Sequence, residues 1–446
     1  MNGAGWKTGL LGSVFFLFWG LAAGGTAPAD LGLICFAGAA CGWQIASMRN
    51  FRSWSARLWK MRDGLLPLLF YLILDVAGFL RSGEFGMLWE KYRVTVLLLA
   101  LMGAMLLSGR RETAFDAVFS GAGLASLAVV LVTLFRYFGG SSAPLEYLLR
   151  FSLRRDYNMY ATALFIGWIC CFFLLCGKER PGWALAGTAL ILPVLLLSGS
   201  RRVMLAVPVA AAAAAWRLIS SGKGRLRRRT AAVLGCGMTV LAASLLLQSA
   251  LMGLSSSPKA INRVSGGGSG SGQTAAAERY ETIGHGSMLT KRRVIWGIAL
   301  EELSDYSPAE WFFGRGGGEN IRLYDRTGEA LDGVYPDREL RRGALSAHSA
   351  LLADLLDGGI LKAAALIWLL GACGWGCLKL LLREPERGLA VGLILGFTIL
   401  SNLVSNRYGL LYDRAFLLFY PLLLLKPERG NPDESPNCNA DHPASA

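Results

Sequence analysis

One histidine marks the junction between a hydrophilic stretch and an apolar run, in the sequence LSAHSALLADLLDGGI. This residue is His348, one of only three histidines in the chain. An ionisable side chain at such a boundary is suited to acid–base chemistry, because histidine titrates near neutral pH. We therefore treat His348 as a candidate general base, although a lone histidine is more often structural. Helical spacing would place it beside Leu351, Leu352 and Leu355 on a helix ending near Gly359.

Arginines occupy two other positions from which they could bind a phosphate group. The segment LLLSGSRRVMLAV closes one apolar run with a Ser-Gly-Ser turn and opens the next with Arg201 and Arg202. Arg293 and Trp296, in KRRVIW, are three residues apart and would share one helix face. A guanidinium is always charged and matches the oxygens of a phosphate. The alternatives are arginines that extend to lipid headgroups and a solvated helix with one aromatic anchor.

Further arginines beside apolar runs are candidates for substrate binding, as an anion-attracting rim or as part of a surface helix on headgroups. They are Arg150, Arg154, Arg155, Arg341 and Arg342. Acidic residues in or near apolar runs are also candidates, because charge at membrane depth is costly. They are Asp75, Asp116, Asp354, Asp357 and Asp413, the last beside Arg414. Their spacing selects none of them and indicates no proton relay.

The chain shows no signature of a bound cofactor. Eight of its nine cysteines lie in apolar runs, and no CxxC pair or metal-ligand spacing occurs, so neither a zinc site nor disulfides are predicted. The segment FFGRGGGEN matches neither a Walker A loop nor a dinucleotide fingerprint. We interpret it, together with the preceding SPAEW, as a turn. We therefore expect no metal and no cofactor.

The elements that must position these residues are membrane-spanning helices. The chain has 446 residues, of which 53% are hydrophobic, and its mean hydropathy is +0.42. Apolar runs long enough to cross a hydrocarbon core of about 30 Å recur along it. We predict an all-α polytopic membrane protein with about twelve spans. They lie near 9–25, 29–48, 64–82, 92–108, 114–136, 159–176, 182–199, 202–220, 231–253, 349–380, 387–404 and 409–425.

The distribution of charge sets the orientation. The net charge of +14 is concentrated in short segments between apolar runs, which is typical of cytoplasmic loops and argues against nucleic-acid binding. With the N-terminus inside, the strongly basic short loops all face the cytoplasm. The predicted organisation is spans one to nine in 1–253, a large outside loop in 254–347, spans ten to twelve in 348–425, and a cytoplasmic tail in 426–446. We expect amphipathic helices in the loop, for example in TKRRVIWGIALEELSDY, beside the flexible linker SGGGSGSG.

Taken together, these motifs resemble the O-antigen ligase family of Gram-negative inner membranes, within a superfamily that includes O-antigen polymerases and protein O-oligosaccharyltransferases. The family pattern of His-Asn/Ser, nine residues and Gly appears as His348-Ser349 and Gly359. Its Ser-Arg turn appears as Ser200-Arg201, and its Arg-x-x-Trp begins at Arg293, followed by the Gly-x-Gly of GRG. The resemblance covers roughly 180–405 well. Two departures are a serine where asparagine is common and a lysine, at position 362, where a small residue is frequent.

The resemblance implies a metal-independent, inverting glycosyl transfer at the periplasmic face of the inner membrane. The donor would be a glycan on undecaprenyl pyrophosphate, with its lipid chain among the spans, and the acceptor a hydroxyl of the lipid A–core. His348 would be the base, Arg201 and Arg293, with Arg202, would neutralise the pyrophosphate, and Trp296 would help to bind the substrate.

Two other classes of function stay open. An O-antigen polymerase or a protein O-oligosaccharyltransferase would differ in its acceptor; a polymerase is expected to have two comparable periplasmic loops, and the one dominant loop here favours a ligase. A transporter of polyprenyl-linked glycans is less favoured. Transporters tend to show internal repeats, broken helices in matched spans and charge near the membrane midplane. The sequence shows no convincing repeat.

Overall fold

The computed structural model describes residues 3–23, 51–108, 110–138, 152–153, 157–176, 181–198, 200–220, 287–327, 345–405 and 409–425. Within these ranges the chain is helical and contains no strand. The helices are α1 (Gly3–Ala23), α3 (Phe51–Lys60), α4 (Arg62–Ser82), α5 (Phe85–Ser108), α6 (Arg111–Phe138), α7 (Tyr157–Cys176), α8 (Gly182–Leu197), α9 (Arg201–Ser220), α13 (Ser287–Ser304), α14 (Pro308–Phe313), α15 (Glu319–Arg326), α17 (Ala350–Arg383), α18 (Pro385–Ser405) and α19 (Arg414–Leu424), with a 3-10 turn at Leu410–Tyr412.

Seven of the described helices are long and apolar enough to cross a membrane. They are α1, α4, α5, α6, α7, α17 and α18; α8 and α19 are shorter apolar helices. A helix satisfies its backbone hydrogen bonds internally, which the interior of a bilayer requires. Large apolar side chains on outward faces, such as Ile73, Ile367 and Leu382, are more than half exposed, as suits contact with lipid. The chain is therefore a membrane protein with an all-helical fold.

The predicted spans agree with the helices where the two can be compared. Spans 29–48 and 231–253 lie outside the described residues, and every other predicted span overlaps a described helix. The main local error is in the segment PAEWFF, which we interpreted as part of a turn and which forms α14. Ser307 and Glu310 build a capping box at its N-terminus, a signal present in the sequence as S-x-x-E.

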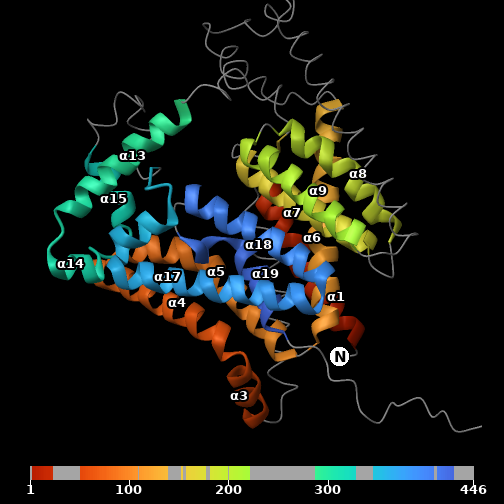
Figure 1. Ribbon diagram of the computed structural model, residues 1–446, viewed down its shortest axis with the longest axis horizontal. Coiled ribbons are helices and arrows are strands. Elements are labelled where there is room, and N and C mark those ends of the chain that lie inside the picture. The colour runs from red at the N-terminus through yellow and green to blue at the C-terminus, as the bar shows by residue number, and fades with distance from the viewer. Residues whose placement is uncertain are drawn as a thin grey trace, which may run out of the picture.

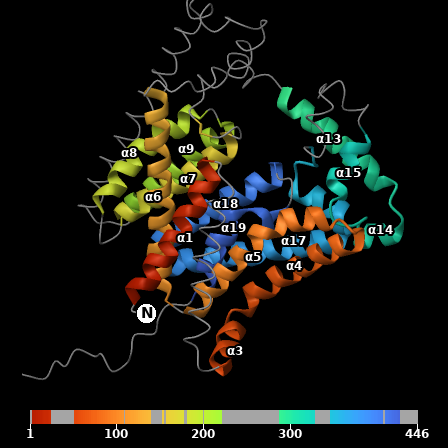
Figure 2. The same cartoon turned by 180° about the vertical axis from the view of Figure 1, so that it is seen from behind.

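The helices pack in two groups that share a centre (Figures 1 and 2). Helices α1, α6, α7, α8 and α9 form one group, and α4, α5 and α17 form the other, with α18 and α19 in contact with both. Phe416 and Phe419 of α19 are fully buried, and Phe419 makes edge contacts with Phe18 and Phe119. Helices α13 to α15 cover one end of the second group, at the left of Figure 1.

Helix α17 is broken at Gly359. The backbone of this residue is non-helical, with φ of 66° and ψ of −163°, a conformation open almost only to glycine. The break frees the carbonyl groups of Leu356 and Asp357. The backbone N–H groups of Arg315 and Gly316 donate to them, over 3.0 and 2.9 Å. The glycine-rich segment after α14 thus docks into the break and supplies the hydrogen bonds that the helix lost.

Substituting Gly359 with alanine should test this break. A Cβ atom at Gly359 would lie 2.5 Å from the carbonyl oxygen of Trp311 and 2.6 Å from the nitrogen of Gly314. Backbone strain alone should lower the free energy of unfolding by about 1–3 kcal/mol. Gly371→Ala is the matched control, since it lies on the same helix with nothing within 4 Å of its Cβ position. Equal unfolding free energies of the two variants, measured by SDS titration in mixed micelles, would contradict the strain assigned to Gly359.

Candidate functional site

His348 lies in a short non-helical segment that leads into α17. Its φ of 47° is the one positive φ among the described non-glycine residues. The residue is half-buried, whereas Ala347 and Ser349 on either side are buried. Helix α17 begins at Ala350 with Ser349 as its N-cap, so His348 precedes the helix. The prediction that His348 shares a helix face with Leu351 is therefore wrong; a left-handed backbone directs its side chain instead.

Helix α13 contacts the segment that carries His348. The indole Nε1 of Trp296 donates to the carbonyl oxygen of Ala347 over 3.0 Å. Ile295 on α13 is fully buried in a small core that includes Ala347 and Leu356, and its carbonyl accepts from the Tyr324 hydroxyl over 2.9 Å. This packing fixes α13 and α15 against the start of α17. It places Trp296 directly beside the residue that precedes His348.

Arg293 lies one turn before Trp296 on the same helix, as the spacing predicts. Its side chain is exposed. The indole of Trp296 is hydrogen-bonded to the Ala347 carbonyl and so holds the His348 segment, while Arg293 lies one turn earlier and is exposed. The two motif residues thus have different surroundings.

The hydrogen bond from Trp296 can be tested by Trp296→Phe. This change leaves the Ala347 carbonyl buried without its donor, which should lower the free energy of unfolding by about 1–3 kcal/mol. Trp375→Phe on α17 is the control, since Trp375 is 56% exposed. Unfolding measured by the loss of helical circular dichroism should separate the two variants, and a loss in the control as large as in Trp296→Phe would count against the assignment.

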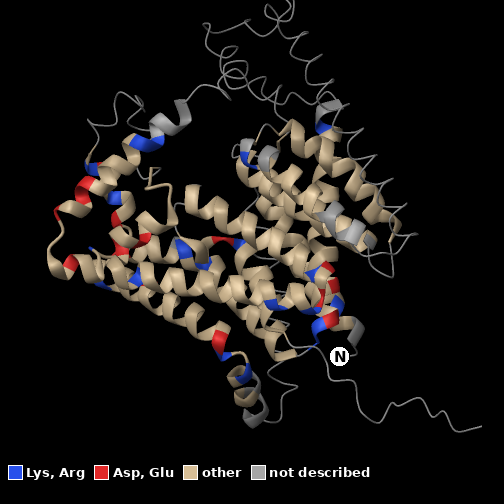
Figure 3. Ribbon diagram, in the orientation of Figure 1, with Lys and Arg blue, Asp and Glu red and all other residues tan. Residues whose placement is uncertain are grey.

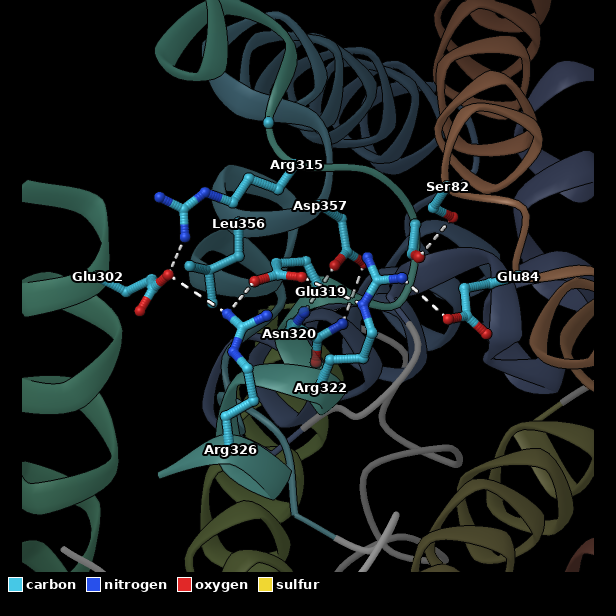
Figure 4. Close-up of polar contacts among 12 residues, drawn as sticks. Ser82, Glu84, Glu302, Arg315, Glu319, Asn320, Arg322, Arg326, Leu356 and Asp357 are labelled. Atoms are coloured by element: carbon cyan, nitrogen blue, oxygen red, sulfur yellow. Dashed lines mark hydrogen bonds and ion pairs between the residues drawn. The ribbon is translucent and has the colours of Figure 1, made fainter. Parts of the chain in front are cut away.

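The glycine-rich segment between α14 and α15 is bound on two sides (Figure 4). On one side it fills the break in α17, where a Cβ at Gly314 would come within 2.4 Å of the Gly358 nitrogen. On the other side it contacts the end of α4, where Gly317 N donates to Gly78 O over 2.8 Å. Arg81 of α4 also donates to the carbonyl of Gly314, over 2.5 Å. The segment therefore joins α4 to α17, and only glycine allows such close approach.

An open pocket of about 660 Å³ lies beside this segment. Arginine and glutamate side chains line it, and each arginine on α15 is paired with carboxylates (Figure 4). Arg322 bridges Glu84 and Glu319 at 2.9 and 3.2 Å, and Arg326 contacts Glu319 at 2.5 Å. The lining residues are Arg81, Ala309, Glu310, Phe313, Gly314, Arg315, Glu319, Arg322 and Arg326.

The charges around the pocket hold one another in place. Arg315 is paired with Glu302 and, over 2.8 Å, with Glu310. Hydrogen bonds from the Ser307 backbone and side chain, together with Arg315, lower the pKa of Glu310 to about 2. Burial raises the pKa of Tyr306, which stays a neutral donor to the Leu356 carbonyl over 3.0 Å. The positive charges of Arg315, Arg322 and Arg326 are therefore neutralised by glutamates, and these ion pairs fix the glycine-rich segment between α14 and α15.

A buried ionic cluster lies between α4, α5 and α17. We define it as Asp75, Lys91, Asp354, Asp357 and Lys362, whose side chains are at most 6% exposed. Sequence reasoning named the three aspartates without being able to select them, recorded Lys362 as a departure from a family pattern, and missed Lys91. The contacts join residues almost three hundred positions apart, and no local pattern reveals them.

The other predicted site residues are placed as follows. Ser200 donates its hydroxyl to Asn158 Oδ1 of α7 over 3.1 Å, so the turn before Arg201 is held by α7. Arg201 and Arg202 open α9, and Arg202 is half-buried. Asp116 pairs with Lys7 at 3.2 Å, and Asp413 caps α19. The candidates outside the described residues are Arg150, Arg154, Arg155, Arg341 and Arg342.

The geometry brings together three motifs that are far apart in sequence: the Arg-x-x-Trp helix, the glycine-rich turn and the His348 segment all meet at the first turns of α17. No protein-family model matches the chain, and comparison with curated proteins gives no significant match. Function is therefore inferred from the residues and their arrangement.

Proposed function

We propose that the protein transfers a glycan from undecaprenyl pyrophosphate to a hydroxyl of a lipid A–core sugar, in the manner of an O-antigen ligase. The acceptor oxygen bonds to the anomeric carbon as the carbon–oxygen bond to the pyrophosphate breaks, and the pyrophosphate leaves with the electron pair. His348 accepts the hydroxyl proton. Arg201 and Arg293, with Arg202, neutralise charge that grows on the leaving group. Attack opposite the leaving group inverts the anomeric centre.

The observation that carries this proposal is the hydrogen bond from Trp296 to Ala347. It holds α13, which carries Arg293, against the segment that carries His348, at the edge of an apolar bundle. A cation for the leaving group and a base for the nucleophile are the two groups that this substitution needs. The exposure of Arg293 leaves its guanidinium accessible to a pyrophosphate.

The proposal includes a membrane topology. The chain would cross the bacterial inner membrane twelve times, with its N-terminus in the cytoplasm and the loop 254–347 in the periplasm. The distribution of charge supports it (Figure 3). In Figure 3, charged residues gather on α13 to α15 at the left and again near the N-terminus at the lower right, while the apolar helices between these two places carry few. The positive-inside bias of the short loops then sets which end faces the cytoplasm.

A second candidate function is transport of a polyprenyl-linked glycan or another anion. Two observations favour it that the sequence did not show: α17 is broken at Gly359, and a buried ionic cluster lies beside the break. Discontinuous helices with intramembrane charge are common in secondary transporters. The internal repeat that often accompanies them is not evident in the sequence.

An in vitro transfer assay tests the proposal. Purified protein would be mixed, in EDTA, with an undecaprenyl-pyrophosphate glycan and, in separate reactions, with rough lipopolysaccharide, a glycan acceptor or a pilin-like protein. We expect product on rough lipopolysaccharide, and its loss in His348→Ala and Arg201→Ala. Lys379→Met, an exposed change on α17, serves as the control and should keep full activity.

Other results of the transfer assay would indicate a different function. Product only on glycan chains would indicate a polymerase, and product only on protein would indicate an O-oligosaccharyltransferase. No transfer to any acceptor, by protein whose circular dichroism shows it to be folded, would refute group transfer. Glycan movement across proteoliposome membranes would then be the activity to measure.

A further inference from the structure

The buried ionic cluster carries an unbalanced charge. Asp75, Asp354 and Asp357 supply three carboxylates, whereas Lys91 and Lys362 supply two ammonium groups. If every group were ionised, the cluster would have a charge of −1. An uncompensated carboxylate in a low-dielectric interior is so costly that such groups take up a proton instead.

The lysines are not shared equally. Asp75 receives both of them, with Lys91 Nζ 2.5 Å from its Oδ2 and Lys362 Nζ 2.5 Å from its Oδ1. The Tyr92 hydroxyl also donates to Asp75. Two cations and a hydroxyl donor favour the ionised form of this carboxyl. Asp75 is therefore the charged centre of the cluster.

The deficit of positive charge falls on the other two carboxyls. Asp354 and Asp357 are one turn apart on α17 and compete for Lys362, whose Nζ lies 3.0 Å from Asp354 and 3.9 Å from Asp357. Asp354 also accepts from the Tyr71 hydroxyl over 2.7 Å. Asp357 accepts from the backbone and side-chain nitrogens of Asn320 over 2.8 and 3.0 Å. These last three contacts are neutral donors, which add no positive charge.

A second observation concerns Asn320, which contacts Asp357. Asn320 is 2% exposed, and its Oδ1 is buried without a hydrogen-bond donor among the described residues. Its amide nitrogen is already bound to Asp357, as Figure 4 shows. Turning the Asn320 amide over would place Oδ1 against Asp357, and a protonated carboxyl would then donate to it, since a carboxylic acid is a donor and a carboxylate is not.

The neighbouring elements do not supply the missing charge within the described ranges. Near the cluster, Glu319 of α15 pairs with Arg322 and Arg326, and Arg315, which lies between α14 and α15, pairs with Glu302 and Glu310. Gly409 approaches the cluster from before α19. Residues 406–408 precede it outside the described ranges, and Arg407 is the charged residue among them. In the part of the chain that is described, no group of three or more His, Cys, Asp or Glu residues could hold a metal ion.

We propose that the cluster is a proton-binding site, in which Asp354 and Asp357 share one proton at neutral pH. The ligand is a single hydrogen ion taken from water, and its uptake converts one carboxylate to a carboxylic acid. Asp354 and Asp357 precede the break in α17, while Lys362 follows it. The proton therefore sits where the two halves of α17 meet. This assignment does not depend on which of the candidate functions is right.

Infrared spectroscopy of the full chain in detergent tests the site directly, because a protonated carboxyl has a C=O band that a carboxylate lacks. At pH 7 the wild-type protein should show one such band. Asp354→Asn and Asp357→Asn should each abolish it, since either change leaves two carboxylates for two lysines. Lys91→Met should double its intensity, and Asp116→Asn, outside the cluster, should leave it unchanged. Circular dichroism would check that each variant is folded.

Two infrared results would contradict the shared proton site. A band lost in only one of the two asparagine variants would mean an isolated protonated aspartate and would overturn the shared site. No band in the wild-type protein would also overturn it. Arg407→Gln then identifies the reason: a band that appears only in this variant would show that Arg407 supplies the missing charge.

Discussion

Lys362→Met should lower the free energy of unfolding by about 3–5 kcal/mol, the cost of leaving buried ionic partners without their counter-charge. Lys362 is 2% exposed, and its ammonium group lies within 3.0 Å of carboxylates from two helices, Asp75 on α4 and Asp354 on α17. Methionine has a similar length, so the substitution removes the charge and leaves most of the packing. We expect the loss in an SDS titration followed by circular dichroism.

The matched control for this prediction is Lys379→Met. Lys379 lies on the same helix but is exposed, with its ammonium group 5.0 Å from the ring of Trp375. An exposed contact of this kind contributes at most about 1 kcal/mol. A Lys362→Met loss no larger than that of Lys379→Met would mean that the cluster does not stabilise the fold.

Substitution of His348 should have the largest effect on activity. If His348 is the general base, its removal should reduce the turnover rate by about 10²–10⁴-fold. Alanine alone is an ambiguous test, because His348 has a φ of 47°, where most side chains are strained. Asparagine tolerates a left-handed backbone but cannot act as a base at neutral pH. His348→Asn should therefore keep the fold and still lose activity.

A neighbouring control separates the base from its surroundings. Ser349→Ala changes the N-cap residue of α17, whose side chain makes no capping hydrogen bond, and should keep the rate near that of wild type. The measurement is initial rate of glycan transfer at equal protein abundance. A near-wild-type rate in His348→Asn would reject His348 as the base while leaving Arg201 and Arg293 to be tested separately.

The positions of the helices could be predicted from the sequence, whereas the contacts between them could not. An apolar run of sufficient length forms a helix in a bilayer whatever its neighbours are. Lys91 shows the limit of this reasoning: the predicted span began at residue 92, whereas α5 begins at Phe85 and places Lys91 well inside the helix. Its charge made it look like a loop residue, and only its partner on α4, Asp75, explains its burial.

The candidate site was predictable in part. The spacing of Arg293 and Trp296 correctly gave one helix face, because helical spacing is local information. That His348 precedes its helix was harder to predict from the sequence, although Ser349 is of a type that often occupies the N-cap position. The docking of Gly314 against Gly358 depends on the approach of two distant segments, and a run of glycines alone does not reveal its partner.

The break at Gly359 has a consequence for how the chain is built into a membrane. Residues 360–383 alone are longer than the roughly twenty residues that a bilayer requires, so they can insert as they are synthesised. Residues 350–358 carry Asp354 and Asp357, and the carbonyl groups of Leu356 and Asp357 accept from the glycine-rich segment. We expect residues 350–358 to pack only after α4, α5 and the glycine-rich segment have packed. The break therefore predicts assembly in two stages, with insertion of residues 360–383 first and docking of the glycine-rich segment against α17 second.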